Sequence, residues 1–443
     1  MDPLWSLEVE GFGRIAHARI EQAPLIVLVG KNNSGKSYMA SLLWGLMNIP
    51  SSARAAARRT QALEWILADL QKVRTSRGSV HHAVSQSDSE HISGSLNRII
   101  EDPAFIAEIF SDDQLVAKKI VVKIKRMAFK QIGISSSEYG DSYISFDGAP
   151  FLQGDKLSFS LGSGIESGEE SHFAQMISDF VVHKALGLAG WPMLFRPIYL
   201  PAARTGILMS LKSLMSSLVD NMRPLHNPQN IRFTLPAVQF LQMMVMAEED
   251  KRSESREIAE HLESSVLAGR VRSKIDGLGG VAYKPRNTDR ELPLFLSSSM
   301  VAELAPFLIL LRSHFKMSAF IIEEPEAHLH LSAQREMARA LVKIVNLGIP
   351  VVITTHSDTF VQQINLLMHL HGHKRRDELM AKFGYEANET LDPEKARAYE
   401  FVDDGSGRTV ARELTKEEEG FVVPSLNETL ADLAKELYEF DKS

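Results

Sequence analysis

The sequence predicts an α/β fold in which a mixed β-sheet is flanked by helices and carries a large helical and β insertion. Three short apolar runs, 25–29, 320–322 and 351–354, are each followed by a stretch with helical spacing of apolar residues. Continuously apolar, β-branched runs are typical of strands covered on both faces of a parallel sheet. The 443 residues are 44% hydrophobic and 24% charged, which supplies a core and excludes a mostly disordered chain.

The composition excludes several classes of functional site. The chain has no cysteine, which excludes disulfides, thiolate zinc sites, iron–sulfur clusters and a cysteine nucleophile. Its 49 basic and 56 acidic residues give a net charge of −7, so a general charge for nucleic-acid binding is absent, while a local basic patch stays open. No secretory signal is recognisable, and no apolar run approaches the roughly 20 residues of a membrane span. We therefore expect a cytoplasmic protein without membrane contact.

The spacing of apolar residues predicts the other elements in order. Further strands are expected at 7–9, 14–20 and 196–201, with a hairpin at 399–409. Helices are expected at 37–46, 53–75, 238–272, 297–315, 327–345, 358–370 and 427–440. The remaining expectations are a polar loop at 76–95, a small β-meander within 116–160 and a glycine-rich turn at 277–285. The charged stretch 248–263 is interpreted as a solvated helix face or, alternatively, as a short coiled-coil-like arm.

The strongest motif follows the apolar run at 25–29 and precedes a helix. It fits G-x-x-x-x-G-K-[ST], and its backbone N–H groups are expected to cradle phosphates. Lys36 would reach the β- and γ-phosphates of ATP, and the Ser37 hydroxyl would ligate Mg²⁺. The alternative is an ordinary glycine turn. The expected nucleotide-binding residues are Gly30, Lys31, Asn32, Asn33, Ser34, Gly35, Lys36 and Ser37.

Two adjacent carboxylates end the apolar strand at 320–322. Glu323 is expected to hold Mg²⁺ through water, and Glu324 to polarise the attacking water as the catalytic base. A Glu-Glu pair departs from the more usual Asp-Glu. The alternative is a solvated, glutamate-rich helix start.

Two polar clusters complete the candidate site. His356 follows the strand at 351–354 and is expected to hydrogen-bond the γ-phosphate as a second catalytic residue, although a lone histidine at a strand end is often structural. Ser297, Ser298 and Ser299 open the helix upstream of the Glu-Glu pair. They could form a second anion site or serve only as an N-cap.

At this order and spacing the four elements resemble ATP-binding-cassette (ABC) ATPases of the SMC and DNA-repair type. More narrowly, they resemble bacterial ATPases of the overcoming-lysogenisation-defect group. Ile321 to His330, with the sequence Ile-Ile-Glu-Glu-Pro-Glu-Ala-His-Leu-His, is typical of that group. The resemblance covers about half of the chain, in the stretches 7–46, 199–206, 292–367 and 399–438.

The resemblance implies a homodimer that sandwiches two ATP molecules with Mg²⁺. One subunit would supply the phosphate loop, the carboxylates and His356. The other would supply the serine-containing signature helix at Ser297 to Ser299, although the usual glycine is missing there. His328 and His330 would lie in the dimer-contact loop; a metal site is the alternative for this pair.

The resemblance also divides the chain into regions. We expect an ATPase-head N-terminal lobe with the phosphate loop at 1–50, an insertion at 51–195, a return to the head at 196–235, a helical arm at 236–290, a C-terminal lobe at 291–370 and completing strands and a helix at 371–443.

Stand-alone ATPases of this group are commonly partners of a separate nuclease or toxin in phage-defence systems such as Septu, PARIS and retron-associated systems. The resemblance therefore implies an ATPase that controls a separate effector. The alternatives are a DNA-repair clamp that binds duplex DNA, a nuclease-ATPase, and a signalling module that binds ATP without hydrolysing it. Basic residues that could line a DNA surface are Arg54, Arg58, Arg59, Lys72 and Arg74.

Overall fold

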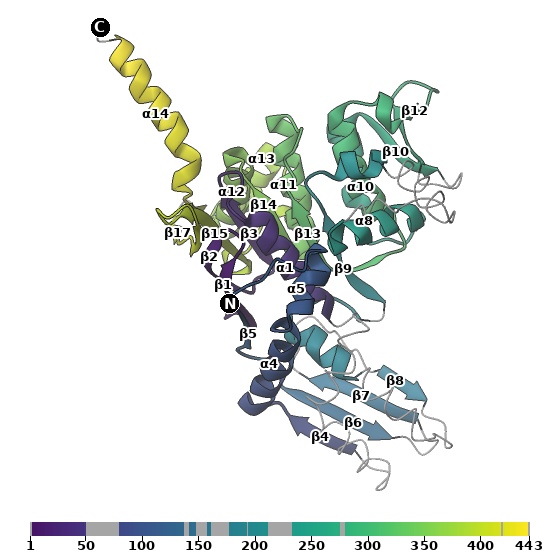
Figure 1. Ribbon diagram of the computed structural model, residues 1–443. Coiled ribbons are helices and arrows are strands. Elements are labelled where there is room, and N and C mark those ends of the chain that lie inside the picture. Colours follow the sequence, from purple (N-terminus) through teal and green to yellow (C-terminus); the bar gives the residue numbers. More distant parts are fainter. Residues whose placement is uncertain are drawn as a thin grey trace, which may run out of the picture.

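A nine-stranded mixed sheet organises the protein (Figure 1). The computed structural model describes residues 2–49, 79–136, 141–147, 157–160, 177–192, 194–210, 233–274, 280–417 and 420–441. In spatial order the strands are β5 (Lys119–Ile124), β1 (Trp5–Phe12), β2 (Ile15–Glu21), β16 (Thr409–Glu413), β15 (Ala396–Asp403), β3 (Leu25–Gly30), β14 (Val351–Thr355), β13 (Lys316–Glu323) and β9 (Phe195–Leu200). The predicted α/β fold with a mixed sheet is confirmed.

The middle of this sheet is parallel and buried on both faces. Strands β15, β3, β14, β13 and β9 are all parallel to one another. All six residues of β3 are buried, as the continuous apolar run at 25–29 predicts. Because the strands run the same way, their carboxyl ends lie at one edge of the sheet, where ligands bind in open α/β sheets.

Alternate residues of β3 enter two separate hydrophobic clusters, one on each face of the sheet. Ile26 and Leu28 pack with the cluster that includes α1 (Lys36–Asn48), α4 (Gln86–Ile100) and α5 (Pro103–Phe110). Leu25, Val27 and Val29 pack with the other cluster. The helices of that second cluster are α8 (Leu235–Met246), α9 (Arg256–Leu262), α10 (Ser299–Arg312), α11 (Leu331–Asn346) and α12 (Asp358–Gly372).

The region 51–195 contributes to two sheets. Strand β5 pairs antiparallel with β1 and so extends the main sheet. The other strands form a four-stranded sheet in the order β4 (Ser79–Ala83), β6 (Gln131–Ser136), β7 (Asp141–Asp147) and β8 (Leu157–Ser160). The meander expected within 116–160 is thus confirmed for β6 to β8, and β4 adds a further edge. The expected helix at 53–75, with its basic residues, lies outside the described residues.

The prediction of one long helix at 238–272 was wrong. The chain there forms α8, α9, a π-helical turn (Glu263–Leu267) and strand β10 (Gly269–Lys274). Ala268 takes a left-handed φ of 47°, which ends the helix. The buried Arg312 then binds the Glu263 carboxylate at 2.7 Å and the Val271 carbonyl, contacts that helical spacing cannot reveal.

Two expected loops are regular elements. The prediction of a glycine-rich turn at 277–285 was wrong for residues 280–285, which form strand β11 (Gly280–Pro285) and pair with β10. The prediction of a polar loop at 76–95 was also wrong, because strand β4 and the first part of helix α4 lie in this range. Ser85 and Asp88 form a capping box that begins α4, a local signal that serine-rich composition obscures. The expected amphipathic helix at 427–440 is confirmed as α14 (Pro424–Asp441). Among the described residues, no helix is both long and apolar enough to span a membrane.

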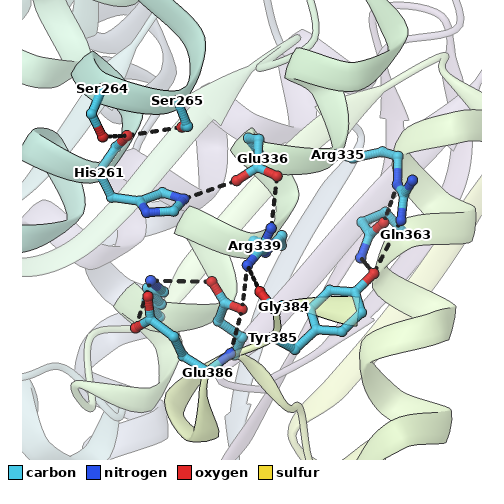
Figure 2. Close-up of polar contacts among 12 residues, drawn as sticks. His261, Ser264, Ser265, Arg335, Glu336, Arg339, Gln363, Gly384, Tyr385 and Glu386 are labelled. Atoms are coloured by element: carbon cyan, nitrogen blue, oxygen red, sulfur yellow. Dashed lines mark hydrogen bonds and ion pairs between the residues drawn. The ribbon is translucent and has the colours of Figure 1, made fainter. Parts of the chain in front are cut away.

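A buried polar network fixes α11 to the segment after α13 (Arg376–Phe383). Figure 2 shows Arg339 between Glu336 and Gly384. The fully buried Glu389 accepts from the Arg339 guanidinium at 2.8 Å and lies 3.1 Å from the Lys343 ammonium. Burial alone would raise the pKa of Glu389, but the hydrogen bonds from Arg339 and from the Glu386 backbone hold it below the ordinary value.

We expect Glu389→Gln to lower the free energy of unfolding by about 3 kcal/mol at neutral pH, because two cations lose their buried partner. The folded-state pKa of Glu389 is depressed. Its stabilisation is therefore present above the ordinary value of 4.5 and is lost as the pH falls through the folded-state value. Urea denaturation should show the difference between wild type and variant shrinking in acid. Glu386→Gln, which removes an exposed carboxylate that pairs with Lys343, should cost under ~1 kcal/mol. Equal costs for the two variants would contradict this assignment.

Candidate functional site

The predicted site residues meet at the carboxyl ends of neighbouring strands. The phosphate loop (Gly30–Ser37) follows β3, Glu323 ends β13, and His356 follows β14, which lies between the other two strands. Tyr199 lies near the end of β9, next to β13. The parallel sheet thus gathers residues that are more than 300 positions apart in the chain.

The phosphate loop has a backbone that requires glycine at two positions. Gly30 has φ 146° and Gly35 has φ 96°. A Cβ atom on Gly30 would lie 2.7 Å from the Phe401 carbonyl oxygen, and one on Gly35 would lie 2.8 Å from Ile15 Cγ1. Helix α1 begins at Lys36, so its free N–H groups face the loop. This concave, donor-rich backbone suits an anion such as a phosphate.

Lys36 is buried and folds back over the loop. Its ammonium donates to the carbonyls of Gly30 and Lys31, each at 2.8 Å. Burial lowers the pKa of Lys36, and the nearby carboxylates of Glu324, Glu326 and Glu323 partly oppose that shift. Both of these backbone partners are neutral carbonyls, and a phosphate oxygen would offer the ammonium a charged partner instead.

Ser37 and Glu323, which are 286 positions apart, are in direct contact. The Ser37 hydroxyl donates to Glu323 Oε2 at 2.8 Å, and the Tyr199 hydroxyl donates to Glu323 Oε1. Burial raises the pKa of Glu323, and these two hydrogen bonds oppose the shift. Two adjacent protein oxygens beside a phosphate cradle fit Mg²⁺, which keeps waters and takes phosphate oxygens as further ligands. The described residues contain no cluster of three or more His, Asp or Glu that could hold a metal by itself.

Glu324 follows Glu323 at a sharp turn of the backbone. Its φ is 44°, in the left-handed region, and its N–H donates to the Thr354 carbonyl at 2.9 Å. The carboxylate is a third exposed, and its Oε1 lies 3.8 Å from His356 Nδ1. The two predicted catalytic residues are therefore neighbours, with both side chains accessible from outside the protein.

Glu326 is a site residue for which the sequence analysis assigned no role. Its buried carboxylate accepts from the Thr355 hydroxyl at 2.6 Å and from the His356 backbone N–H at 2.9 Å. The same oxygen lies 3.6 Å from His356 Nδ1. Glu326 thus positions the loop that carries His356. The only sequence signal is its place in the Glu-Glu-Pro-Glu run.

Arg204 is a second residue without an assigned role, within the family-like stretch 199–206. Its guanidinium, 2% exposed, donates to the backbone carbonyls of Glu323 at 2.9 Å and Glu324 at 3.2 Å. It also donates to the Glu303 carbonyl at 3.1 Å and forms an ion pair with the Glu303 carboxylate at 3.0 Å. Burial lowers the pKa of Arg204, and four carboxylates oppose that shift. Arg204 joins the Glu-Glu turn to α10.

The serine run opens α10 as an N-cap. The Ser298 side chain accepts from the Val301 N–H at 3.4 Å, and the Ser297 hydroxyl donates to the Pro293 carbonyl at 3.3 Å. Phe295 and Leu296, just before the run, are exposed. The cap is therefore present, and the signature role of Ser297 to Ser299 stays a prediction. His330 likewise caps α11 by accepting from the Ser332 N–H.

We expect Arg204→Met to lower the free energy of unfolding by about 3–5 kcal/mol, because Glu303 and two carbonyls lose a buried cation. The double variant Arg204→Met/Glu303→Gln should recover part of that loss, since no unpaired charge remains. Urea denaturation of the two variants and of Glu303→Gln provides the measurement. A double variant no more stable than Arg204→Met would mean that the ion pair with Glu303 contributes little.

Comparison with known proteins assigns a family model to part of the chain. Residues 226–361 match the model described as AAA ATPase domain. This segment holds Glu323, Glu324 and His356, and the phosphate loop precedes it. No curated protein matches the chain.

Several SMC head structures are similar to this chain at low identity. An SMC head bound to the C-winged helix domain of ScpA is 12% identical with a TM-score of 0.40, covering 94% of this chain and 99% of that one. The SMC head domain from Thermotoga maritima is 12% identical with a TM-score of 0.34, covering 94% and 100%. A Pyrococcus furiosus SMC head is 11% identical with a TM-score of 0.38, covering 98% of each. The phosphate loop between β3 and α1 and the order of the parallel strands support a P-loop α/β fold.

Proposed function

We propose that the protein binds and hydrolyses ATP with Mg²⁺, dimerises on ATP and thereby controls a separate effector protein. The contact between Ser37 and Glu323 carries this proposal, because it joins the phosphate loop to the carboxylate pair. A glycine turn and an unrelated glutamate-rich helix start would have no reason to meet. The matched AAA ATPase domain model supports the same reading.

Each side chain has a defined role in this proposal. Lys36 exchanges its carbonyl partners for phosphate oxygens. Ser37 and Glu323 would hold Mg²⁺, which would supply positive charge beside the phosphates. Glu324 accepts a proton from the attacking water at its carboxylate. His356, whose Nδ1 lies 3.8 Å from Glu324 Oε1, donates a hydrogen bond to the γ-phosphate. Glu326 and Arg204 position these groups and act only through them.

Two apolar residues that a single chain leaves exposed support the proposed dimer. Phe295 and Leu296 lie beside the serine run on the surface. In the proposed sandwich, Ser297 to Ser299 and the α10 N-terminus close on the nucleotide held by the partner subunit. Burial of the two apolar side chains would add to the stability of the closed dimer.

The effector is proposed to be a nuclease or toxin in anti-phage defence, supported by the family resemblance. We expect the chain alone to cut neither DNA nor RNA. Asp403 and Asp404 accept hydrogen bonds from Gly405 and Ser406 within their own exposed turn, which does not form a two-metal site. Native mass measurement of the purified complex should show a second chain. Strong, salt-dependent DNA binding by the isolated chain would instead favour the DNA-repair clamp.

We expect Glu324→Gln to keep ATP binding and to slow hydrolysis by ~10²-fold or more, because the general base is lost while its shape remains. The variant should also accumulate as an ATP-bound dimer. Phosphate release and calorimetric ATP titration measure the two properties separately.

Lys36→Ala is the matched control, because it should lose ATP binding itself in calorimetry. Glu323→Gln should weaken the Mg²⁺ dependence rather than trap the dimer. If Glu323→Gln gives the trapped dimer and Glu324→Gln does not, the roles of the two carboxylates are reversed.

We expect Ser298→Arg to leave ATP binding by the monomer intact and to prevent the ATP-dependent dimer. A long cation at a helix N-terminus opposes both the local dipole and close packing. Sedimentation velocity with and without ATP, in the Glu324→Gln background, reports dimerisation. A variant that still dimerises would show that the serine run is only a cap.

A further inference from the structure

Helix α14 is an amphipathic arm whose outer half is fully exposed. We propose that it docks a separate protein that presents an apolar groove or helix face rimmed by lysine and arginine. Figure 1 shows α14 extending away from the rest of the chain. Every residue from Asp432 to Phe440 is exposed.

The exposed half carries large apolar side chains on one face. Leu433 is 52% exposed, Leu437 58% and Phe440 75%. Residues at i, i+4 and i+7 lie on the same side of a helix. In the sequence the same alternation of three and four residues continues back through Leu430 and Leu426. This is the spacing of a coiled-coil seam or of a helix that binds in a groove.

A helix of this kind is poorly stabilised when alone in water. Isolated helices of this length are marginal, and most helical stability in proteins comes from burying an apolar face. The one side-chain ion pair within its outer half, Lys435 with Asp432, is exposed and contributes little. A partner that covers Leu433, Leu437 and Phe440 would bury the apolar face and so stabilise the helix.

The charge on α14 selects the occupant. Pro424–Asp441 contains five acidic residues and one basic residue, Lys435. In the sequence pattern, Glu436 and Asp441 occupy the g and e positions, which set partner choice in helix pairs. A second copy of α14 would bring acidic flanks against acidic flanks, and an anionic membrane would repel them. A partner with basic residues beside its apolar contact is complementary.

This inference rests on the proposed function only for the expectation that the partner is the effector. The docking surface involves no residue of the ATP site. Loss of ATP binding in Lys36→Ala and loss of docking through α14 are therefore separate outcomes.

The test uses the full chain and two synthetic three-heptad peptides with leucine at the a and d positions. One peptide has lysine at e and g, and the other has glutamate. Fluorescence anisotropy should show binding of the lysine peptide, weakened by salt, and about tenfold weaker binding of the glutamate peptide. Lys36→Ala should bind the lysine peptide as the wild type does.

Two variants examine the two parts of the surface. Leu433→Ser/Leu437→Ser should weaken binding of the lysine peptide about tenfold or more, whereas Leu347→Ser/Leu366→Ser, with two exposed leucines elsewhere, should not. Glu436→Lys/Asp441→Lys keeps the apolar stripe and should reverse the preference between the peptides.

Three results would overturn the proposal. One is no binding of the lysine peptide, and another is equal binding of both peptides. The third is a nucleotide-free dimer in sedimentation that Leu433→Ser/Leu437→Ser abolishes, which would make a second copy the occupant.

Discussion

The buried guanidinium of Arg204 connects the parts of the site that the proposed mechanism requires to act together. It holds the carbonyls of both Glu323 and Glu324 and pairs with Glu303 on α10. The Glu-Glu turn faces the phosphate loop of its own chain, while the α10 N-terminus carries the serines proposed to face the partner's nucleotide. Because a planar guanidinium binds several acceptors in fixed directions, a small shift of either element would be felt by the other. Lysine could not make the same set of contacts.

The site contains two buried charged groups, the ammonium of Lys36 and the carboxylate of Glu323, and burial of either charge costs free energy. Burial lowers the pKa of Lys36 and raises the pKa of Glu323, so each charged form is disfavoured by its surroundings. Neighbouring opposite charges and hydrogen bonds oppose both shifts. A site of this kind gains from a ligand that brings its own phosphates and a divalent cation, since these pair with the lysine and the carboxylate. The exposed Glu324 and His356 lie outside that buried layer, where a water could reach them.

The proposed ATP site and the proposed docking helix α14 lie on different parts of the chain. The proposed nucleotide site is built on the parallel strands of the main sheet, whereas α14 is an exposed arm. Rigid strands position reacting groups with little freedom, and an exposed amphipathic helix can be covered by a partner without disturbing them. The polar network around Glu389 fixes the segment that leads into β15, next to β3.

The sequence by itself determined the phosphate loop, the strand-end carboxylates and the parallel core, because each depends on contiguous residues. The run at 25–29, the glycines of the loop and the start of α1 are local signals of backbone geometry and burial. Only the tertiary structure revealed the contacts of Arg204, Glu326 and Tyr199, since each binds residues distant in the chain. It also replaced the expected helix at 238–272, where Arg312 binds Glu263 and Val271 from a later helix. Helical periodicity records which residues are apolar, and it carries no information about a buried ion pair formed across the fold.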